Sequence, residues 1–429
     1  MPLNTKSTNR KISRRNIFVV SIGIFAIIFA VVFAGKFGQT SLAQNSISTD
    51  KELAETIERL TDRSMDGLVE EKSPNGGYFI NLQGRFQNVV IAKQEADIDV
   101  ETACVTSLGE ANAFFGRNLK TGESIANPLF KKDKSAKIAA QNGISQGEFE
   151  FFNKLIEEAE QRRLLNPSLA TITIVNNDGA GEGFNDLSPR SPEGGNTGTT
   201  LGQQRLNVFN RAAAIWGAFL DTNVAIKIDS KYDPLPCTPT EATLGGAGTI
   251  GMWKDFPNAM YSGTWYHSAL SNKLVGSDLA PNTNEIGATF NSNIDNGCLG
   301  GSRFYYGLDN STPPNTSNML ITVLHEMGHG LGFSSFVNGV TGQLNDGFPD
   351  IFTRYMFDRT TNLYWYQMTD AQRRASALNN GNVLWDGPNV KNASSFLTAP
   401  QGVCNSIRPL HLCQAHQSLT LTKPLSQIY

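Results

Sequence analysis

The segment TVLHEMGHGLGF, residues 322–333, carries two histidines four positions apart and a glutamate directly after the first. Its apolar residues recur at helical spacing, which predicts a helix that packs against a core. His325 and His329 then lie one turn apart, so both imidazoles project to the same side of that helix. Gly332, just after the second histidine, allows the chain to turn sharply there.

Two imidazoles in this arrangement are suited to binding one zinc ion. Glu326 would lie beside the metal, where it can take a proton from water and return it to a leaving amine. The alternative is a buried helix that carries two histidines by chance. Ser317 or Asn318 can cap the start of the helix. The capped apolar helix, in a chain with only 5 histidines, favours a catalytic zinc site at His325 and His329.

The whole chain has 429 residues and a net charge of −3, and 40% of its residues are hydrophobic. This composition is ordinary for a globular protein and allows two or three domains. No basic face stands out, so we expect no nucleic-acid partner. Phosphate-binding glycine loops are also missing from the sequence.

The N-terminus has the features of an export signal. The basic segment KISRRN precedes an uncharged apolar run from Ile17 to Ala34, and Ser41 and Ala43 fit a small-x-small cleavage site. We expect residues 1–43 to be a cleaved signal peptide or an uncleaved signal anchor. Both readings place the rest of the chain outside the cytoplasm, secreted or at the cell surface or periplasm. A membrane contact is expected only through this segment.

An exported chain can form disulfides, and this one has 5 cysteines. We expect Cys237 to pair with Cys298, while Cys404 and Cys413 can pair in the tail. Cys104 is then left over. A lone cysteine in a pro-region can cap a zinc ion as a thiolate, but a free or partly buried thiol is the favoured interpretation.

Residues 44–165 are predicted to form a small α+β module, which can be a pro-region. Tyr78–Leu82 and Phe86–Ala92 read as a hairpin with Gly84 near its turn. ETACVTS is a possible third strand, and a short helix ends at Gly116. After the charged linker KKDKSAK, an amphipathic helix follows. We expect this module to be separable from the rest and able to mask it.

Residues 170–390 read as a second unit. A strand in TITIVNND precedes a helix that contains Leu206 and Leu220, then a strand around Val224–Ile228, a glycine-rich stretch, two short strands and the histidine helix. This order predicts an α+β domain with a mixed, twisted sheet and helices packed against it. Residues 391–429 show no clear periodicity and are taken as an irregular tail.

The histidine segment resembles the active-site helix of zincin metallopeptidases. Its HEMGHGLG form is similar to the H-E-x-x-H-x-x-G-x-x-H pattern of the metzincins. Together with GTTLGQQRLNVFNRAAAIWG and MTDAQRRAS, it resembles a family of exported bacterial zincin-like proteins that often carry a protease-associated domain. The resemblance covers roughly Ala170 to Val390. It implies a zinc-dependent endopeptidase that acts on proteins or peptides.

The chain departs from this pattern at the third ligand. Ser335 stands where the metzincin pattern has its third histidine, and no histidine occurs between His329 and His411. A downstream aspartate is then expected to complete the site. Asp350 is favoured because its apolar flank suggests an element docked under the metal. Asp346 and Asp358 are the other candidates, and a structural cap or salt bridge is an equal reading for each aspartate.

Several other residues have both a functional and a structural reading. Met356 and Met368 are candidates for a methionine turn, although core packing is the usual role of methionine. Tyr306, Tyr355 or His267 can supply an extra donor to the transition state. A structural role is the favoured interpretation for each of these three.

Two other functional classes are alternatives to the peptidase. A catalytically inactive zincin-fold protein, acting as a surface or binding module, is favoured by the missing third histidine and opposed by Glu326. A serine hydrolase is excluded because GFSSF does not match the G-x-S-x-G pattern of a nucleophile elbow.

Overall fold

The computed structural model describes residues 48–94, 100–125, 146–165, 170–309, 311–379, 382–387 and 404–405. The expected signal segment, the KKDKSAK linker and Cys413, the expected partner of Cys404, lie outside this part of the chain. Within it, no helix is both long and apolar enough to cross a membrane. The disulfide between Cys237 and Cys298 is present, as the sequence predicted.

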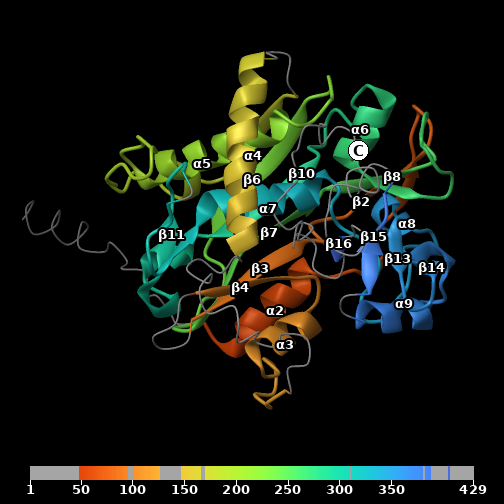
Figure 1. Ribbon diagram of the computed structural model, residues 1–429, viewed down its shortest axis with the longest axis horizontal. Helices are drawn as coiled ribbons and strands as arrows, with labels where there is room; N and C mark the ends of the chain where they lie inside the picture. The colour runs from red at the N-terminus through yellow and green to blue at the C-terminus, as the bar shows by residue number, and fades with distance from the viewer. Residues whose placement is uncertain are drawn as a thin grey trace, which may run out of the picture. The chain divides into compact units, whose positions relative to one another are not determined.

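A mixed six-stranded sheet forms the centre of the fold, which confirms the α+β class (Figure 1). Its strands, in spatial order, are β4 (Glu101–Val105), β3 (Asn88–Lys93), β7 (Glu241–Thr249), β10 (Ile286–Asn291), β6 (Ile226–Asp233) and β5 (Ile172–Asn176). β5, β6 and β10 run parallel, whereas β7, β3 and β4 each pair antiparallel with their neighbours.

Helices cover both faces of this sheet. On one face, α5 (Leu201–Gly217) packs against α7 (Met319–Leu331), which carries the histidine motif. On the other face, α2 (Asp50–Leu60) and α3 (Leu108–Phe115) cover β3 and β4. Side chains of β3 alternate between the two faces of the sheet. Val90 and Ala92 lie in the core that contains α7, whereas Val89 and Ile91 lie in the core that contains α2 and α3.

A second sheet consists of β1 (Glu70–Lys72), β2 (Tyr78–Asn81), β8 (Gly251–Lys254) and β9 (Trp265–His267). The remaining strands are β11 (Arg303–Tyr305), β12 (Thr316–Asn318), β13 (Met356–Asp358), β14 (Leu363–Tyr364), β15 (Val383–Trp385) and β16 (Cys404–Asn405). The remaining α-helices are α4 (Gln146–Leu165), α6 (Ser268–Val275), α8 (Ile351–Arg354) and α9 (Asp370–Ala377).

The predicted hairpin between residues 78 and 92 is wrong, although both of its strands exist. β2 pairs with β1 and β8, whereas β3 pairs with β4 and β7. Gln83, Gly84 and Phe86 take positive φ angles of 52°, 78° and 58°, so the chain turns away instead of folding back. Ile80 and Phe86 are then both buried in a cluster beside the second sheet.

Strand β7 was missed in the sequence because its glycines read as a loop. A Cβ at Gly245 would lie 2.4 Å from the ring of Phe290, and one at Gly246 would lie 2.6 Å from the carbonyl oxygen of Asn88. The glycines are therefore required by close packing on both sides of the strand. The strand runs directly beside the motif helix α7.

The N-terminal strands share sheets with the segments that follow residue 170. β3 lies against β7, and β2 lies against β8. Residues 47–429 form one compact unit, so the expected boundary near residue 165 does not coincide with a break between compact units. Whether residues 44–165 can be separated from the rest stays a prediction.

Candidate metal centre

Helix α7 is defined by local signals that the sequence analysis identified. The side chain of Asn318 caps its start by accepting a hydrogen bond from the main-chain nitrogen of Ile321 at 3.1 Å. Gly332 ends it with a φ of 123°, a conformation that favours glycine. Trp216 of α5 donates to the carbonyl oxygen of Leu324 at 3.0 Å, which fixes α7 against its neighbour.

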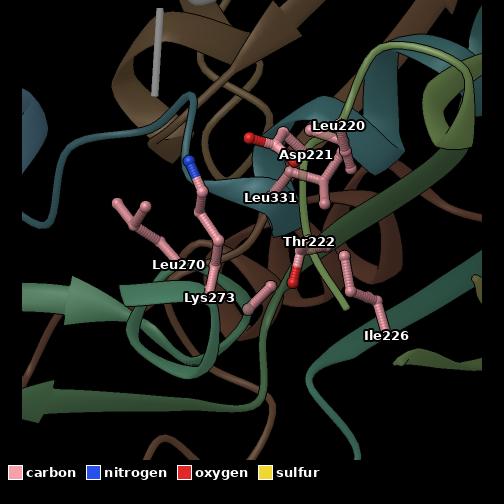
Figure 2. A pocket seen from close by; sticks show the side chains of 8 residues that line it. Leu220, Asp221, Thr222, Ile226, Leu270, Lys273 and Leu331 are labelled. Atoms are coloured by element: carbon pink, nitrogen blue, oxygen red, sulfur yellow. The ribbon is translucent and has the colours of Figure 1, made fainter. Parts of the chain in front are cut away.

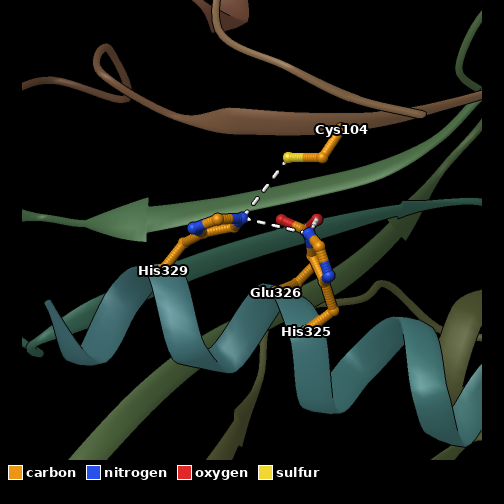
Figure 3. A group of neighbouring side chains, drawn as sticks. All are labelled: Cys104, His325, Glu326 and His329. Atoms are coloured by element: carbon orange, nitrogen blue, oxygen red, sulfur yellow. Dashed lines mark hydrogen bonds and ion pairs between the residues drawn. The ribbon is translucent and has the colours of Figure 1, made fainter. Parts of the chain in front are cut away.

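The structure brings His325, Glu326 and His329 together with Cys104, which comes from strand β4 (Figure 3). One ligand atom from each of the four side chains lies within 4.8 Å of the others. Figure 3 shows the cysteine pointing from its strand toward the two imidazoles on the helix. This group can bind a metal ion.

The separations between the donor atoms match a tetrahedral centre. The Nε2 atoms of His325 and His329 are 3.1 Å apart, and the sulfur of Cys104 lies 3.4 Å from Nε2 of His329. With Zn–N bonds of about 2.0–2.1 Å and a Zn–S bond of about 2.3 Å, tetrahedral angles place two nitrogens about 3.4 Å apart and a nitrogen and sulfur about 3.5 Å apart. Both separations are therefore compatible with the binding of one metal ion.

The ring of His329 is held in place by contacts at both of its nitrogens. Its Nδ1 lies 2.9 Å from the carbonyl oxygen of Phe333, which can only accept a hydrogen bond. The side-chain nitrogen of Asn88 lies 2.7 Å from the same Nδ1, and Nε2 faces Cys104 and His325. Burial lowers the pKa of His329 to about 4, so the imidazole is neutral at pH 7.

Glu326 is fully buried, yet only one of its oxygens is hydrogen-bonded. Oε2 accepts from the main-chain nitrogen of Ala247 in β7 at 2.6 Å. Oε1 has no hydrogen-bond partner, and it lies 4.0 Å from Nε2 of His325. Burial raises the pKa of this carboxyl well above its usual range, and the hydrogen bond from Ala247 offsets part of that rise. A buried acceptor that faces the ligand group is suited to a water or an ion.

Cys104 reaches the site through the pairing of three strands. It lies opposite Val90 of β3, which in turn lies opposite Gly245 of β7. Side chains at paired positions project from the same face of a sheet, and Val90 belongs to the core that contains α7. From the sequence, Cys104 is a possible cap for zinc, but its position in the chain does not place it near the histidines. Burial, followed by the charge of Glu326, raises the pKa of its thiol.

Asp350, expected as the third ligand, is not among these four residues. It caps α8: its Oδ1 accepts from the main-chain nitrogen of Thr353 at 2.7 Å. Its Oδ2 accepts from Thr353 Oγ1 at 2.6 Å, from the main-chain nitrogen of Phe336 at 2.8 Å and from Ser335 Oγ at 3.2 Å. Both carboxylate oxygens are therefore engaged in holding local structure.

The other two aspartates are also placed apart from the histidines. Asp346 is exposed and has a positive φ of 50° in a turn. Asp358 is buried and accepts hydrogen bonds from the main-chain nitrogens of Thr360 and Thr361 at 2.7 and 3.1 Å. Ser335, at the third position of the metzincin pattern, is turned toward Asp350.

The remaining candidates have structural surroundings. Met356 and Met368 pack in one apolar cluster beside β13. Tyr306 donates to Asp295, and the hydroxyls of Tyr355 and Tyr261 lie 3.3 Å apart. His267 is buried, with Nε2 2.7 Å from Ser334 Oγ and its ring stacked on Phe336.

A small hollow lies apart from the four grouped residues (Figure 2). It is lined mainly by apolar side chains of the chain between α5 and β6, of α6 and of the last residue of α7. Lys273 and Asp221 are the charged residues at its wall. The hollow contains none of the four grouped side chains and offers no second set of metal donors.

No protein-family model, no curated protein and no solved structure matches this chain. The described residues show an α+β fold and a partly buried group of side chains that can bind a metal ion.

Proposed function

We propose that this protein is an exported zinc-dependent peptidase in which His325 and His329 bind the metal and Glu326 is the general base. The observation that carries the proposal is the group of donor atoms on one face of α7, with the unpartnered oxygen of buried Glu326 beside them. In the described conformation, the sulfur of Cys104 is the third donor. The likeness of HEMGHGLG to the zincin helix supports the same assignment.

The residues would divide the chemistry among them. A zinc ion held here would supply Lewis acidity to water and to the carbonyl of a scissile peptide bond. Glu326 accepts the proton of the attacking water at Oε1 and later gives it to the departing nitrogen. The carbonyl of Phe333 keeps the ring of His329 oriented, and the main chain of β7 holds the other oxygen of Glu326 in place.

Export is part of the proposal for two reasons. The N-terminal sequence has a basic segment, an apolar run and a small-residue cleavage site. The disulfide between Cys237 and Cys298 is typical of oxidising compartments. A protein or peptide substrate outside the cytoplasm fits both features.

A second candidate function is supported by the burial of the site. Glu326 and His329 are fully buried, and structural zinc sites are closed whereas catalytic ones keep an open position. A zincin-fold binding protein with a purely structural metal would show the same burial. The side chain of His325 retains 17% exposure, which leaves one side of the group near solvent.

The first test is the zinc content of the purified chain, measured together with casein hydrolysis in the presence and absence of a chelator. We expect one zinc ion per chain and hydrolysis that the chelator abolishes and added zinc restores. A chain that purifies and folds without zinc, and does not take it up, would contradict the proposal. Hydrolysis that survives removal of the metal would place the activity elsewhere.

A further inference from the structure

An asparagine of the central sheet contacts His329 without belonging to the group of metal donors. Asn88 is the first residue of β3 and its exposed fraction is 1%. It stands two positions before Val90, so it projects from the face of the sheet that packs against α7. Its side-chain nitrogen lies 2.7 Å from Nδ1 of His329, the ring nitrogen that does not face Cys104. Asn88 can therefore act on a metal ligand from behind.

Arg63 fixes which end of the Asn88 amide faces the imidazole. An asparagine side chain offers an acceptor oxygen and a donor NH2 group at similar positions, so its partners decide its orientation. Nη2 of Arg63 lies 3.0 Å from Oδ1 of Asn88, and a guanidinium can only donate. The same guanidinium is anchored by donating from Nη1 to the carbonyl oxygen of Ser335 at 2.7 Å. The amide oxygen is thus held by Arg63, and the NH2 group faces His329.

Nδ1 of His329 consequently lies between a donor and an acceptor. The NH2 group of Asn88 is 2.7 Å away, and the carbonyl oxygen of Phe333 is 2.9 Å away. A proton on Nδ1 suits Phe333 but sets two donors against each other at Asn88. A lone pair on Nδ1 suits Asn88 but sets two acceptors against each other at Phe333. A neutral imidazole carries a single proton, so only one of these contacts is favourable at a time.

The two tautomers differ in what Nε2 can bind. With the proton on Nδ1, the lone pair of Nε2 is available to a metal. With the proton on Nε2, that atom is a donor, and Nε2 of His325 lies 3.1 Å from it. The second tautomer also accepts from Asn88, whose amide is held by a charge-assisted bond from Arg63, and such bonds are roughly twice as strong as neutral ones. This tautomer is therefore favoured in the metal-free chain.

We propose that Asn88, oriented by Arg63, is a positioning residue that places the proton of His329 on Nε2 and thereby lowers the affinity of the site for zinc. The inference rests on the metal site of the proposed function and adds a control of its affinity. To become a ligand, His329 must release the proton of Nε2 to solvent and take one up at Nδ1. It must also lose its bond from Asn88, which opposes the binding of the metal.

The first experiment determines the tautomer in the metal-free full chain. The two ring nitrogens of a neutral histidine have different ¹⁵N chemical shifts according to which one carries the proton. The protein is labelled with ¹⁵N-histidine, and the spectrum of His329→Gln identifies the signals of His329. We expect the proton on Nε2 in the wild type. In Asn88→Asp we expect it on Nδ1, because a carboxylate accepts from both Arg63 and the imidazole. A wild type with the proton on Nδ1 would overturn the inference.

The second experiment measures the affinity for zinc of the wild type and of Asn88→Asp, by competition with a chelator of known affinity. We expect the variant to bind zinc roughly tenfold more tightly, since partners of this kind change metal affinity by about 10–100-fold. The sign of the effect is informative, because a substitution that only damages packing weakens binding. Equal or weaker binding by a folded variant would overturn the inference.

The two experiments together separate the tautomer from other causes. Tighter binding without a change of tautomer would assign the gain to the added negative charge, and it would also overturn the inference. If Asn88→Asp does not fold, the spectrum of the wild type decides alone. A wild type that takes up no zinc would contradict the proposed function, whereas the tautomer of His329 in that chain would still test the role of Asn88.

Discussion

Two buried carboxylates, one on α7 and one at the start of α8, are used in opposite ways. Asp350 accepts hydrogen bonds at both oxygens from residues of its own neighbourhood. Glu326 accepts one hydrogen bond, from Ala247, and leaves Oε1 without a partner. An unsatisfied buried acceptor costs about 1–3 kcal/mol. A carboxylate that bears this cost beside two histidines is the one suited to chemistry, whereas the satisfied one holds the fold.

The largest effect is expected from Glu326→Gln. Glutamine keeps the size of the side chain and can still accept from Ala247, but it cannot take a proton from water. We expect full zinc content and a loss of casein hydrolysis of roughly 10²–10⁴-fold. Zinc content and casein hydrolysis are measured on the same preparations of the parent chain and the variant.

His329→Ala is the control for that experiment, because it should lose the metal itself and not only the catalysis. If Glu326→Gln hydrolyses casein at the rate of the parent chain, the unpartnered oxygen has no role in the reaction. The contrast between the two carboxylates would then be one of packing alone.

Local sequence signals predicted the motif helix well. Asn318 and Gly332 act within a few residues, so the start and end of α7 could be read directly from the chain. The same kind of signal was present at Asp350, because an aspartate followed by a short helical segment is a typical N-cap. Asp350 does cap α8 in the structure. The cap was therefore the better of the two interpretations of this residue.

The covering of the site could not be read from the sequence. Strand β7 was not predicted, because glycines usually mark turns. The close approach of Asn88 and Phe290 to the strand explains why glycines are needed there. Cys104 was noticed as a left-over cysteine, but its position depends on two successive strand pairings, β4 with β3 and β3 with β7. Pairing between distant segments leaves no periodic signal in either segment.

An effect on stability rather than on metal binding is expected from Asp350→Ala. The substitution removes the cap of α8 and leaves the donors in Phe336 and Thr353 without their acceptor. We expect the free energy of unfolding to fall by about 1–3 kcal/mol, measured by urea denaturation. Zinc content should stay at that of the wild type.

Asp350→Asn is the matched variant, since asparagine can still cap the helix and should be less destabilising than alanine. If Asp350→Ala instead loses its zinc while it stays folded, the aspartate is the third ligand that the sequence suggested. The assignment of that position to Cys104 would then be wrong.

The smallest effect is expected for another buried ionisable side chain, the imidazole of His267. His267 has its Nε2 2.7 Å from Ser334 Oγ, while its Nδ1 is buried without a partner. Burial, with a smaller contribution from the charge of His329, lowers the pKa of His267 to about 3. In the unfolded chain a histidine takes up a proton below about pH 6.5. Between these values the unfolded state binds more protons, so stability falls as the pH decreases.

We therefore expect the free energy of unfolding of the metal-free protein to decrease between pH 6.5 and about 3, with His267 contributing about 1.4 kcal/mol per pH unit. Urea denaturation at several pH values, for the wild type and for His267→Gln, measures this contribution. Glutamine can keep a hydrogen bond to Ser334 but takes up no proton when the chain unfolds. The change in the free energy of unfolding per pH unit should be smaller in the variant by the amount that one bound proton contributes. Equal slopes in the two chains would show that His267 is protonated as easily in the folded protein as in the unfolded one, and that this buried imidazole is solvated in solution.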